Sequence, residues 1–75
     1  MLIKLQLSNE KEFEIDIEPD YTVGKIKKLI YEKEEIPADK QKLLLKGLVM
    51  KDDETASEHK LENGTKLSLI LALRG

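Results

Sequence analysis

The order in which the hydrophobic period changes along these 75 residues most constrains the fold. Alternation at every second residue indicates a half-buried strand, whereas a period of about 3.6 residues indicates an amphipathic helix. Apolar and polar residues alternate over residues 1–7 and again over residues 12–17, with a polar turn at residues 8–11 between them. The chain is therefore predicted to begin with a hairpin of two strands. The solvent side of the second strand is entirely acidic, which protects a sheet edge from pairing with another chain.

A single amphipathic helix is expected after the hairpin. Pro19 breaks the second strand because proline has no N–H for the ladder, and Thr22 is expected to cap the helix. Apolar residues then recur at helical spacing, at Val23, Ile26, Leu29 and Ile30. We predict a helix over about residues 23–34, which Ile36-Pro37 ends.

The second half of the chain is predicted to consist of short elements. Short strands are expected at residues 43–45, 48–50 and 67–71. Lys46-Gly47 and Asn63-Gly64 are turn signals, and Thr55-Ala56-Ser57-Glu58 fits a capping box that predicts a brief helical turn. A single sheet with one helix packed across it buries all of these apolar faces, which is an α+β roll.

The composition argues against catalysis. The sequence contains no cysteine, so disulfides, a thiolate nucleophile and thiolate zinc sites are excluded. His59 is the only histidine, which leaves a histidine metal cluster or a Ser-His-Asp triad without partners. We therefore expect no enzyme activity, no metal site and no cofactor.

Charge and hydropathy favour a soluble protein. The net charge is -2, whereas a nucleic-acid binder usually shows a basic excess. Residues 1–4 do not resemble the start of a signal peptide. The most apolar stretch, residues 67–73, is much shorter than the ~20 residues needed to span a bilayer. The expected location is the cytoplasm and nucleus.

Several segments together resemble ubiquitin and its relatives over the whole chain. They are Met1-Leu2-Ile3-Lys4, residues 12–19, Ile36-Pro37, Gln41, Leu43, Gly47 and the tail from Leu67 to Gly75. Further positions carry residues common in the neddylation-modifier, or Rub, branch of this family. These are Leu2, Lys4, Glu12, Glu14, Asp16, Ile26, Met50, Ala56, Lys60 and Gly64.

Ala72 distinguishes the two branches most sharply. Ubiquitin carries an arginine at this position, and the resemblance implies that the two activating enzymes sort the modifiers largely by it. An arginine in the pocket of the neddylation activating enzyme would repel a second arginine, whereas Ala72 avoids the like-charge contact. Leu48 and Asn63 also occupy the positions of ubiquitin's two most used chain-forming lysines. A polymeric degradation tag of the ubiquitin type is therefore disfavoured.

The resemblance implies a ubiquitin-like β-grasp roll, a mixed sheet of four to five strands with one main helix packed across it. It divides the chain into a folded domain, residues 1–70, and a flexible conjugation tail, residues 71–75. In this family an activating enzyme adenylates the terminal carboxylate with ATP, and thioester transfers then carry it to a substrate lysine. The reactive end here would be Gly75, held against the enzymes by Leu71, Ala72, Leu73 and Arg74.

One departure concerns the end of the tail. The family's mature tail ends in two glycines, whereas Gly75 is the last residue here. We expect either that one more glycine follows in the native protein or that the protein is not processed to the usual end.

The resemblance also implies two binding surfaces. The first comprises Ser8, Leu44, Leu48, Ser68 and Ile70, with Lys42, Lys46 and Lys66 as a basic rim. By alternation Leu44 and Ile70 point away from the helix, and they become neighbours if the last strand pairs with the third. Ser8 and Ser68 replace a leucine and a histidine common in the family, which makes these edges less apolar. The second surface comprises Ile36, Leu71 and Leu73.

Two positions bear on stability. His59 stands where relatives carry a tyrosine, and we interpret it as structural. The family has a glycine at position 35, suited to a left-handed helix end, whereas this chain has Glu35. We predict that Glu35 either keeps a positive φ, at a cost on the order of 1 kcal/mol, or shifts the end of the helix.

The leading hypothesis is a protein modifier of the neddylation type. The implied partners are an activating enzyme with its ATP, a conjugating enzyme, a ligase, a deconjugating protease and cullin-type substrates. No nucleic-acid or membrane partner is expected, and the chain is expected to be a monomer. The alternative from another class is a non-covalent ubiquitin-like docking domain cut from a larger protein, which the encoded residues after Gly75 would distinguish. A divergent ubiquitin is a third possibility, which Ala72 argues against.

Overall fold

The computed structural model describes residues 1–7 and 10–71, and residues 8–9 and 72–75 lie outside this description. Its elements follow the predicted order along the chain. They are β1 (Leu2–Leu7), β2 (Glu12–Asp16), α1 (Val23–Glu34), the short 3-10 helix η1 (Ala38–Lys40), β3 (Gln41–Leu45), β4 (Leu48–Val49) and β5 (Lys66–Leu71).

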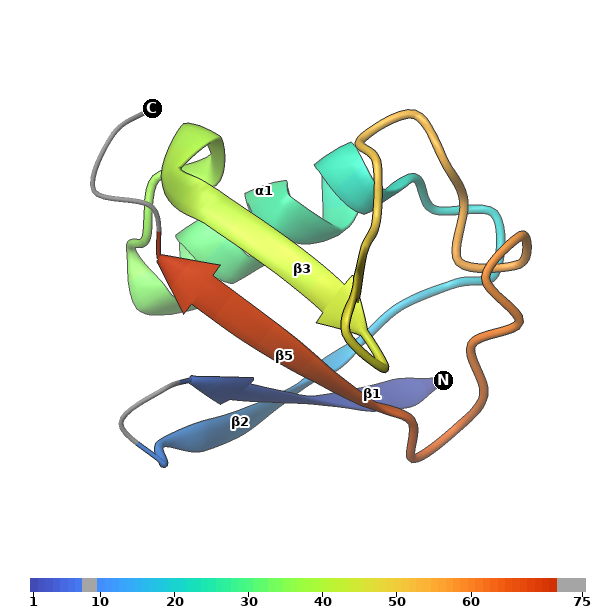
Figure 1. Cartoon of the computed structure of the whole chain (residues 1–75), viewed down its shortest axis with the longest axis horizontal. Helices are drawn as coiled ribbons and strands as arrows, with labels where there is room; N and C mark the ends of the chain where they lie inside the picture. Colours follow the sequence, from blue (N-terminus) through green and yellow to red (C-terminus); the bar gives the residue numbers. More distant parts are fainter. Residues whose placement is uncertain (8–9, 72–75) are drawn as a thin grey trace.

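The strands of the described residues form one sheet in the order β2-β1-β5-β3-β4 (Figure 1). β1 and β5 are parallel, whereas β2 pairs with β1, β5 with β3 and β3 with β4 in antiparallel fashion. The first and last strands thus lie side by side within the sheet, and β2 and β4 are its edges. This mixed sheet with one main helix confirms the predicted α+β roll.

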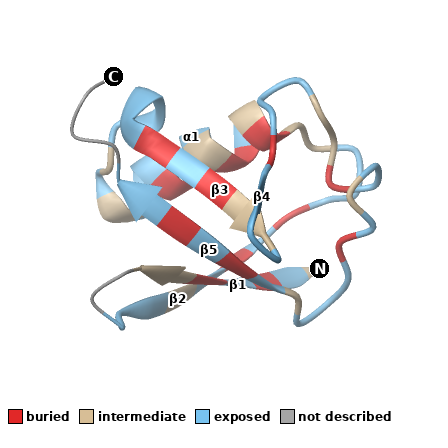
Figure 2. Ribbon diagram, in the orientation of Figure 1, coloured by how far each residue is buried: buried red, intermediate tan, exposed pale blue. Residues whose placement is uncertain are grey.

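The core lies between α1 and the face of the sheet that it crosses. Buried and exposed residues alternate along β3 and β5 (Figure 2). The inward positions of β1 and β5, which include Ile3, Leu5, Leu67 and Leu69, are completely or almost completely buried. Val23, Ile26 and Ile30 of α1 are completely buried as well. Because side chains alternate along a strand, the remaining positions form an outer face that is exposed to solvent.

The start of α1 agrees with the prediction. The hydroxyl of Thr22 accepts a hydrogen bond from the Lys25 N–H at 3.2 Å. The N–H groups of Val23 and Gly24 donate to the carbonyl groups of Glu54 and Asp52, at 2.8 and 3.0 Å. The loop of residues 51–61 therefore supplies acceptors for the first N–H groups of the helix.

Glu35 takes the first of its two predicted alternatives. It lies in the left-handed region, with φ 60° and ψ 27°, directly after the last residue of α1. Its N–H donates to the Tyr31 carbonyl at 2.7 Å, which satisfies one of the free acceptors at the helix end. The helix therefore ends where it was predicted to end, and a glutamate occupies a conformation that favours glycine.

The predicted capping box is present, in a single turn. The Thr55 N–H donates to the Glu58 carboxylate at 2.9 Å, and the Glu58 N–H donates to the Thr55 hydroxyl at 3.1 Å. Lys60 then adopts a left-handed φ of 55°, which ends the turn before a longer helix can form. Among the described residues, no helix has the length and apolar character required to cross a membrane.

Candidate functional site

The outer face of β3 and β5 brings together the central pair of the first predicted surface. Ile70 lies opposite Lys42 and Leu44 lies opposite Ser68, so Leu44 and Ile70 are diagonal neighbours across the two strands. Ile70 is 44% exposed and Leu44 is half-buried. The strand pairing on which the expected neighbourhood of these two side chains depended is thus present.

Val49 belongs to the same surface and was not predicted. The register pairs Val49 with Leu44 and Leu48 with Leu45. Val49 therefore extends the outer face beyond Leu44, and it is 57% exposed. Leu48 is 74% exposed at the sheet edge, but its partner Leu45 packs against the core. We call Leu44, Val49 and Ile70, with Leu48 at the border, the outer patch.

The register of β4 could have been found from the sequence. Lys46-Gly47 forms a two-residue turn, with positive φ values of 52° and 83°. A two-residue hairpin loop pairs the residues directly before and after it, which here are Leu45 and Leu48. The next pair along the ladder is then Leu44 with Val49, so the turn alone identifies the missed residue.

Lysines surround the outer patch, as predicted, although one of them is already engaged. Lys42 and Lys46 are exposed. The Lys66 ammonium lies 3.2 Å from the Glu12 carboxylate, and Lys66 also lies opposite Lys4 on β1. The basic rim is therefore strongest beside β3, where Lys42 and Lys46 make no ion pair within residues 1–7 and 10–71.

Polar groups interrupt the outer face between β1 and β3. Ser68 is exposed and lies between Gln6 on one side and Leu44 on the other. Ser8 lies outside the described residues. The apolar part of this face is therefore concentrated on β3, β4 and the end of β5.

The second predicted surface lies where β3 begins and β5 ends. Leu71 is 47% exposed and lies opposite Gln41, whose side-chain amide donates to the Ile36 carbonyl at 2.8 Å. The same amide nitrogen donates to the Lys27 carbonyl at 3.0 Å, so Gln41 fixes this corner to α1. Ile36 itself packs partly against the core. Leu73, the third predicted member, lies outside the described residues.

β5 ends at this corner of the sheet (Figure 1). Leu71 is the last described residue, at the end of β5. The predicted roles of Ala72, Leu73, Arg74 and Gly75 lie outside the described residues and stay predictions.

His59 is part of a contact that orders the loop of residues 51–61. Its Nε2 atom lies 2.8 Å from the Glu54 carboxylate, which also accepts the Lys51 N–H at 2.8 Å. The hydrogen bond from the Lys51 backbone, and after it the one from His59, lower the pKa of the Glu54 carboxyl. His59 is half-buried, and this contact is in keeping with the structural role that we assigned to it.

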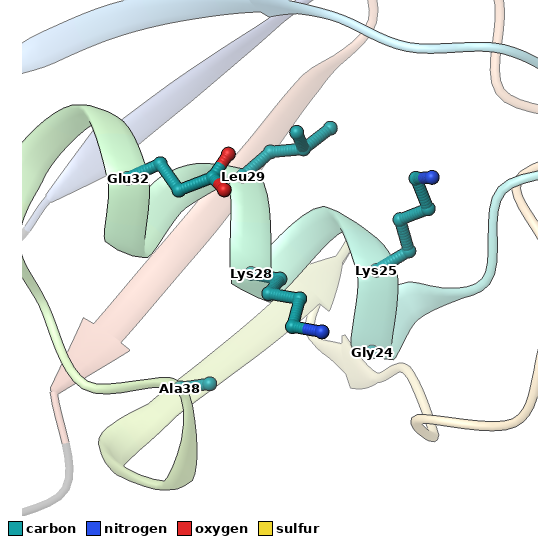
Figure 3. Close-up of a pocket in the computed structure, with 6 residues that line it drawn as sticks. All are labelled: Gly24, Lys25, Lys28, Leu29, Glu32 and Ala38. Atoms are coloured by element: carbon teal, nitrogen blue, oxygen red, sulfur yellow. The ribbon is translucent and has the colours of Figure 1, made fainter.

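A hollow lies on the solvent side of α1 (Figure 3). Its volume is about 420 Å³. The lining residues are Gly24, Lys25, Lys28, Leu29, Glu32 and Ala38. The Lys25 ammonium also lies 4.7 Å from the centre of the Tyr21 ring. Among the described residues, no group of three or more His, Cys, Asp or Glu side chains could hold a metal ion.

Comparisons with known proteins agree with this arrangement. Residues 2–74 match the model of the ubiquitin family. The chain is 48% identical over 75 residues to the ubiquitin-like protein NEDD8 of Dictyostelium discoideum, covering 100% of this chain and 97% of that one. It is 47% identical to ubiquitin-like protein 1 of Schizosaccharomyces pombe, covering 100% of this chain and 96% of that one.

The fold matches a solved structure closely. The UBL domain of Plasmodium falciparum Dsk2 superposes with a TM-score of 0.89 at 30% identity, covering 96% of this chain and 97% of that one. This likeness confirms the ubiquitin-like β-grasp fold. The chain therefore belongs to the ubiquitin family, which is not a family of enzymes, and it is similar over its whole length to NEDD8-like members of that family.

Proposed function

We propose that this protein is a modifier of the neddylation type, attached through its terminal glycine to lysines of other proteins. The observation that carries the proposal is the identity of 48% to a NEDD8 protein and 47% to ubiquitin-like protein 1, both of which the chain covers almost from end to end. The chain also matches a domain of a longer protein, the ubiquilin of Dictyostelium discoideum, but at a lower identity of 35% and over 13% of that protein.

The chemistry takes place at the tail. The carboxylate of the terminal glycine attacks the α-phosphorus of ATP and releases pyrophosphate, and an enzyme thiolate then displaces AMP to form a thioester. After transfer to a conjugating enzyme, the amine of a substrate lysine displaces the thiolate and forms an isopeptide bond. Glycine suits this end because, without a Cβ atom, its backbone can enter a narrow slot.

Ala72 is the proposed selectivity residue. A small neutral side chain avoids like-charge repulsion in a pocket that contains an arginine, whereas an arginine at this position would meet it. This repulsion excludes a modifier with arginine at the position of Ala72. The chain with Ala72 then needs no additional attractive contact to be selected.

The two surfaces are proposed to have different roles in binding. The outer patch, with Lys42 and Lys46 beside it, would serve non-covalent recognition, because small apolar patches rimmed by charge often mark partner sites. Leu71 and Ile36 would support the tail at the corner of the sheet. The proposed partners are activating and conjugating enzymes, a ligase, a deconjugating protease and cullin-type substrates, in the cytoplasm and nucleus.

A second candidate function is a non-covalent docking domain. It is favoured by the structural likeness to a UBL domain, with a TM-score of 0.89. The encoded sequence after Gly75 distinguishes the two candidates. A single glycine or a short processed tail supports the modifier, whereas a long folded continuation supports the docking domain.

The test is ATP-dependent thioester formation with purified activating enzymes. The chain is offered, as it stands and with one added glycine, to the neddylation and the ubiquitin activating enzymes separately, beside an Ala72→Arg variant. We expect a thiol-sensitive thioester with the neddylation enzyme alone, and a loss of this product in the variant. If neither form of the chain yields a thioester with either enzyme, the modifier proposal is wrong.

A further inference from the structure

We propose that the free edge of β2 is a second, non-covalent binding site, which takes an extended peptide with basic residues at alternate positions. The peptide would add to the sheet as one more strand. β2 and β4 are the two opposite edges of the sheet, so this edge is distant from the outer patch, which lies at the β4 end. The site would therefore be accessible when the outer patch is occupied, and it does not depend on conjugation through the tail.

The first step concerns the backbone groups at this edge. Met1 and Ile17 exchange both of their backbone hydrogen bonds, at 2.7 and 2.8 Å. In an antiparallel ladder, pairs that exchange hydrogen bonds alternate with pairs that do not. The N–H and C=O groups of Glu12, Glu14 and Asp16 are therefore directed away from β1, toward the free edge.

Lys33 supplies independent support for this direction. Its ammonium group donates to the Glu14 carbonyl at 2.7 Å, from α1 across to the edge of β2. This carbonyl is thus accessible to a donor that does not belong to the sheet. A peptide N–H can take the same position when the flexible Lys33 side chain moves aside.

The second step concerns a groove beside the edge. The groove lies between β2 and α1 and has a volume of about 490 Å³. On the helix side its apolar lining comprises Ile15 of β2 and Leu29 of α1, and Leu2, an outward residue of β1 that is 45% exposed, lies at its border. The other lining residues are charged: Glu14, Asp16, Glu32 and Lys33. In an added strand, alternate side chains would point toward the helix side and pack here, and the other set would lie on the outer face of the sheet.

The third step concerns charge, which identifies the occupant. The side chains of Glu12, Glu14 and Asp16 are exposed on the outer face of β2. A second copy of β2 would place carboxylates beside carboxylates, and like charges on neighbouring strands are destabilising. Lysine or arginine side chains at the same positions reverse the sign of this interaction. The acidic edge therefore excludes self-association and selects a basic strand.

Some of these carboxylates already face cations of the chain. Glu12 lies 3.2 Å from Lys66, and Asp16 lies 2.9 Å from the amino group of Met1. Glu14, at the centre, makes no ion pair within the part of the chain that the structure describes, although it lies opposite Lys4. Exposed pairs of this kind contribute little to stability, so an incoming basic side chain can share the carboxylates.

The test uses a synthetic probe, the acetylated and amidated heptapeptide Lys-Val-Lys-Val-Lys-Val-Lys, titrated into the ¹⁵N-labelled full chain. We expect saturable shifts of amide signals in residues 12–16 and at Leu29 and Lys33. A peptide methylated on the alternate backbone nitrogens that would pair with β2 keeps the same charge, and we expect it to bind about tenfold more weakly or worse. The corresponding glutamate-valine peptide should not bind.

Two substitutions examine the charge argument. Glu14→Lys reverses the central charge of the edge and should weaken binding by about tenfold. Asp39→Lys makes the same change on the exposed side of η1 and should leave binding unchanged. Glu14→Gln, which should weaken binding less, keeps the test valid if the lysine variant proves unstable in a thermal melt.

Three results would overturn the proposal. One is the absence of saturable binding by the probe. Another is equal binding of the methylated peptide, which would show attraction by charge alone. The third is a set of shifts at Leu44 and Ile70 rather than at residues 12–16.

Discussion

The outer patch and the loop of residues 51–61 are both irregular in sequence, yet they use their side chains in different ways. In the loop, polar groups bond to one another and to α1. Glu54 accepts from Lys51 and contacts His59, and the carbonyl groups of Glu54 and Asp52 accept from the first N–H groups of the helix. In the outer patch, Leu48 and Val49 are 74% and 57% exposed and contact mainly solvent.

We infer from this difference that the loop stabilises the fold and that the outer patch binds partners. The loop closes the start of α1, and the Lys27–Asp52 ion pair, at 2.6 Å, ties it to the helix again. Changes there should alter stability. The exposed side chains of the outer patch contribute little to stability. Substitutions there should therefore change partner binding and leave the fold intact. The predictions that follow test this separation, from the largest expected effect on stability to the smallest.

The same substitution at two isoleucines should have very different effects. Ile26 is completely buried and Ile70 is 44% exposed. Ile26→Ala should lower the free energy of unfolding by about 2–5 kcal/mol because it leaves a cavity. Ile70→Ala should lower it by about 1 kcal/mol or less. Urea unfolding measures both, and equal losses would show that Ile70 belongs to the core rather than to a surface for partners.

Loss of the capping box should have an intermediate effect. Thr55→Ala removes the hydroxyl that accepts from the Glu58 N–H, and it should cost about 1 kcal/mol of unfolding free energy. Ser57→Ala, in the same turn, is the matched control because the hydrogen bonds of Ser57 come from its backbone: its N–H donates to the Pro19 carbonyl and its carbonyl accepts from the Lys60 N–H. Its effect should stay within about 0.5 kcal/mol. Similar losses in both variants would contradict a specific role for the cap.

Glu35→Gly should stabilise the protein. At φ 60° a glutamate side chain is strained, and glycine removes this strain, so the gain should be about 1 kcal/mol or less. Glu32→Gly, inside the exposed face of α1, should instead cost about 1 kcal/mol. Thermal and urea unfolding compare the two variants. A loss of stability on Glu35→Gly would show that the helix end is held by other contacts of Glu35.

The hydrogen bonds that Glu54 accepts in the loop should appear as a pH dependence of stability. The Lys51 N–H and His59 lower the pKa of Glu54, so the unfolded chain binds this proton more tightly than the folded chain. The contribution is complete above the pKa of the unfolded state and is lost as the pH falls through the lowered pKa of the folded state. Unfolding measured between about pH 5 and pH 1 should show a shallower loss of stability for Glu54→Gln. Parallel curves would exclude this contribution of Glu54.

The regular parts of the fold were predictable from the sequence, because their periods reflect burial directly. The bounds of α1, its cap at Thr22 and the outward direction of Leu44 and Ile70 follow from spacing alone, whereas the pairing of β3 with β5 was only a condition of their neighbourhood. Val49 was missed because apolar residues follow one another at residues 48–50, which gives no alternation to read. Only the two-residue turn before them sets the register.

Other features depend on contacts between distant segments, which spacing does not contain. The contact of His59 with Glu54, and the closing of α1 by the carbonyl groups of Glu54 and Asp52, need the loop to fold back onto the helix. The free edge of β2 could be inferred from its acidic side chains, but the groove beside it required the position of Leu29. The roles assigned to Ala72 and Gly75 come from resemblance to the family and stay predictions.

The most direct test of the central claim is the response of the ¹⁵N-labelled chain to the neddylation activating enzyme, followed by amide signals. The enzyme should shift or broaden the signals of Leu44, Ile70 and Leu71, and leave those of the loop of residues 51–61 close to their free positions. The opposite result, with changes centred on the loop and an unaffected outer patch, would contradict the division between support and recognition.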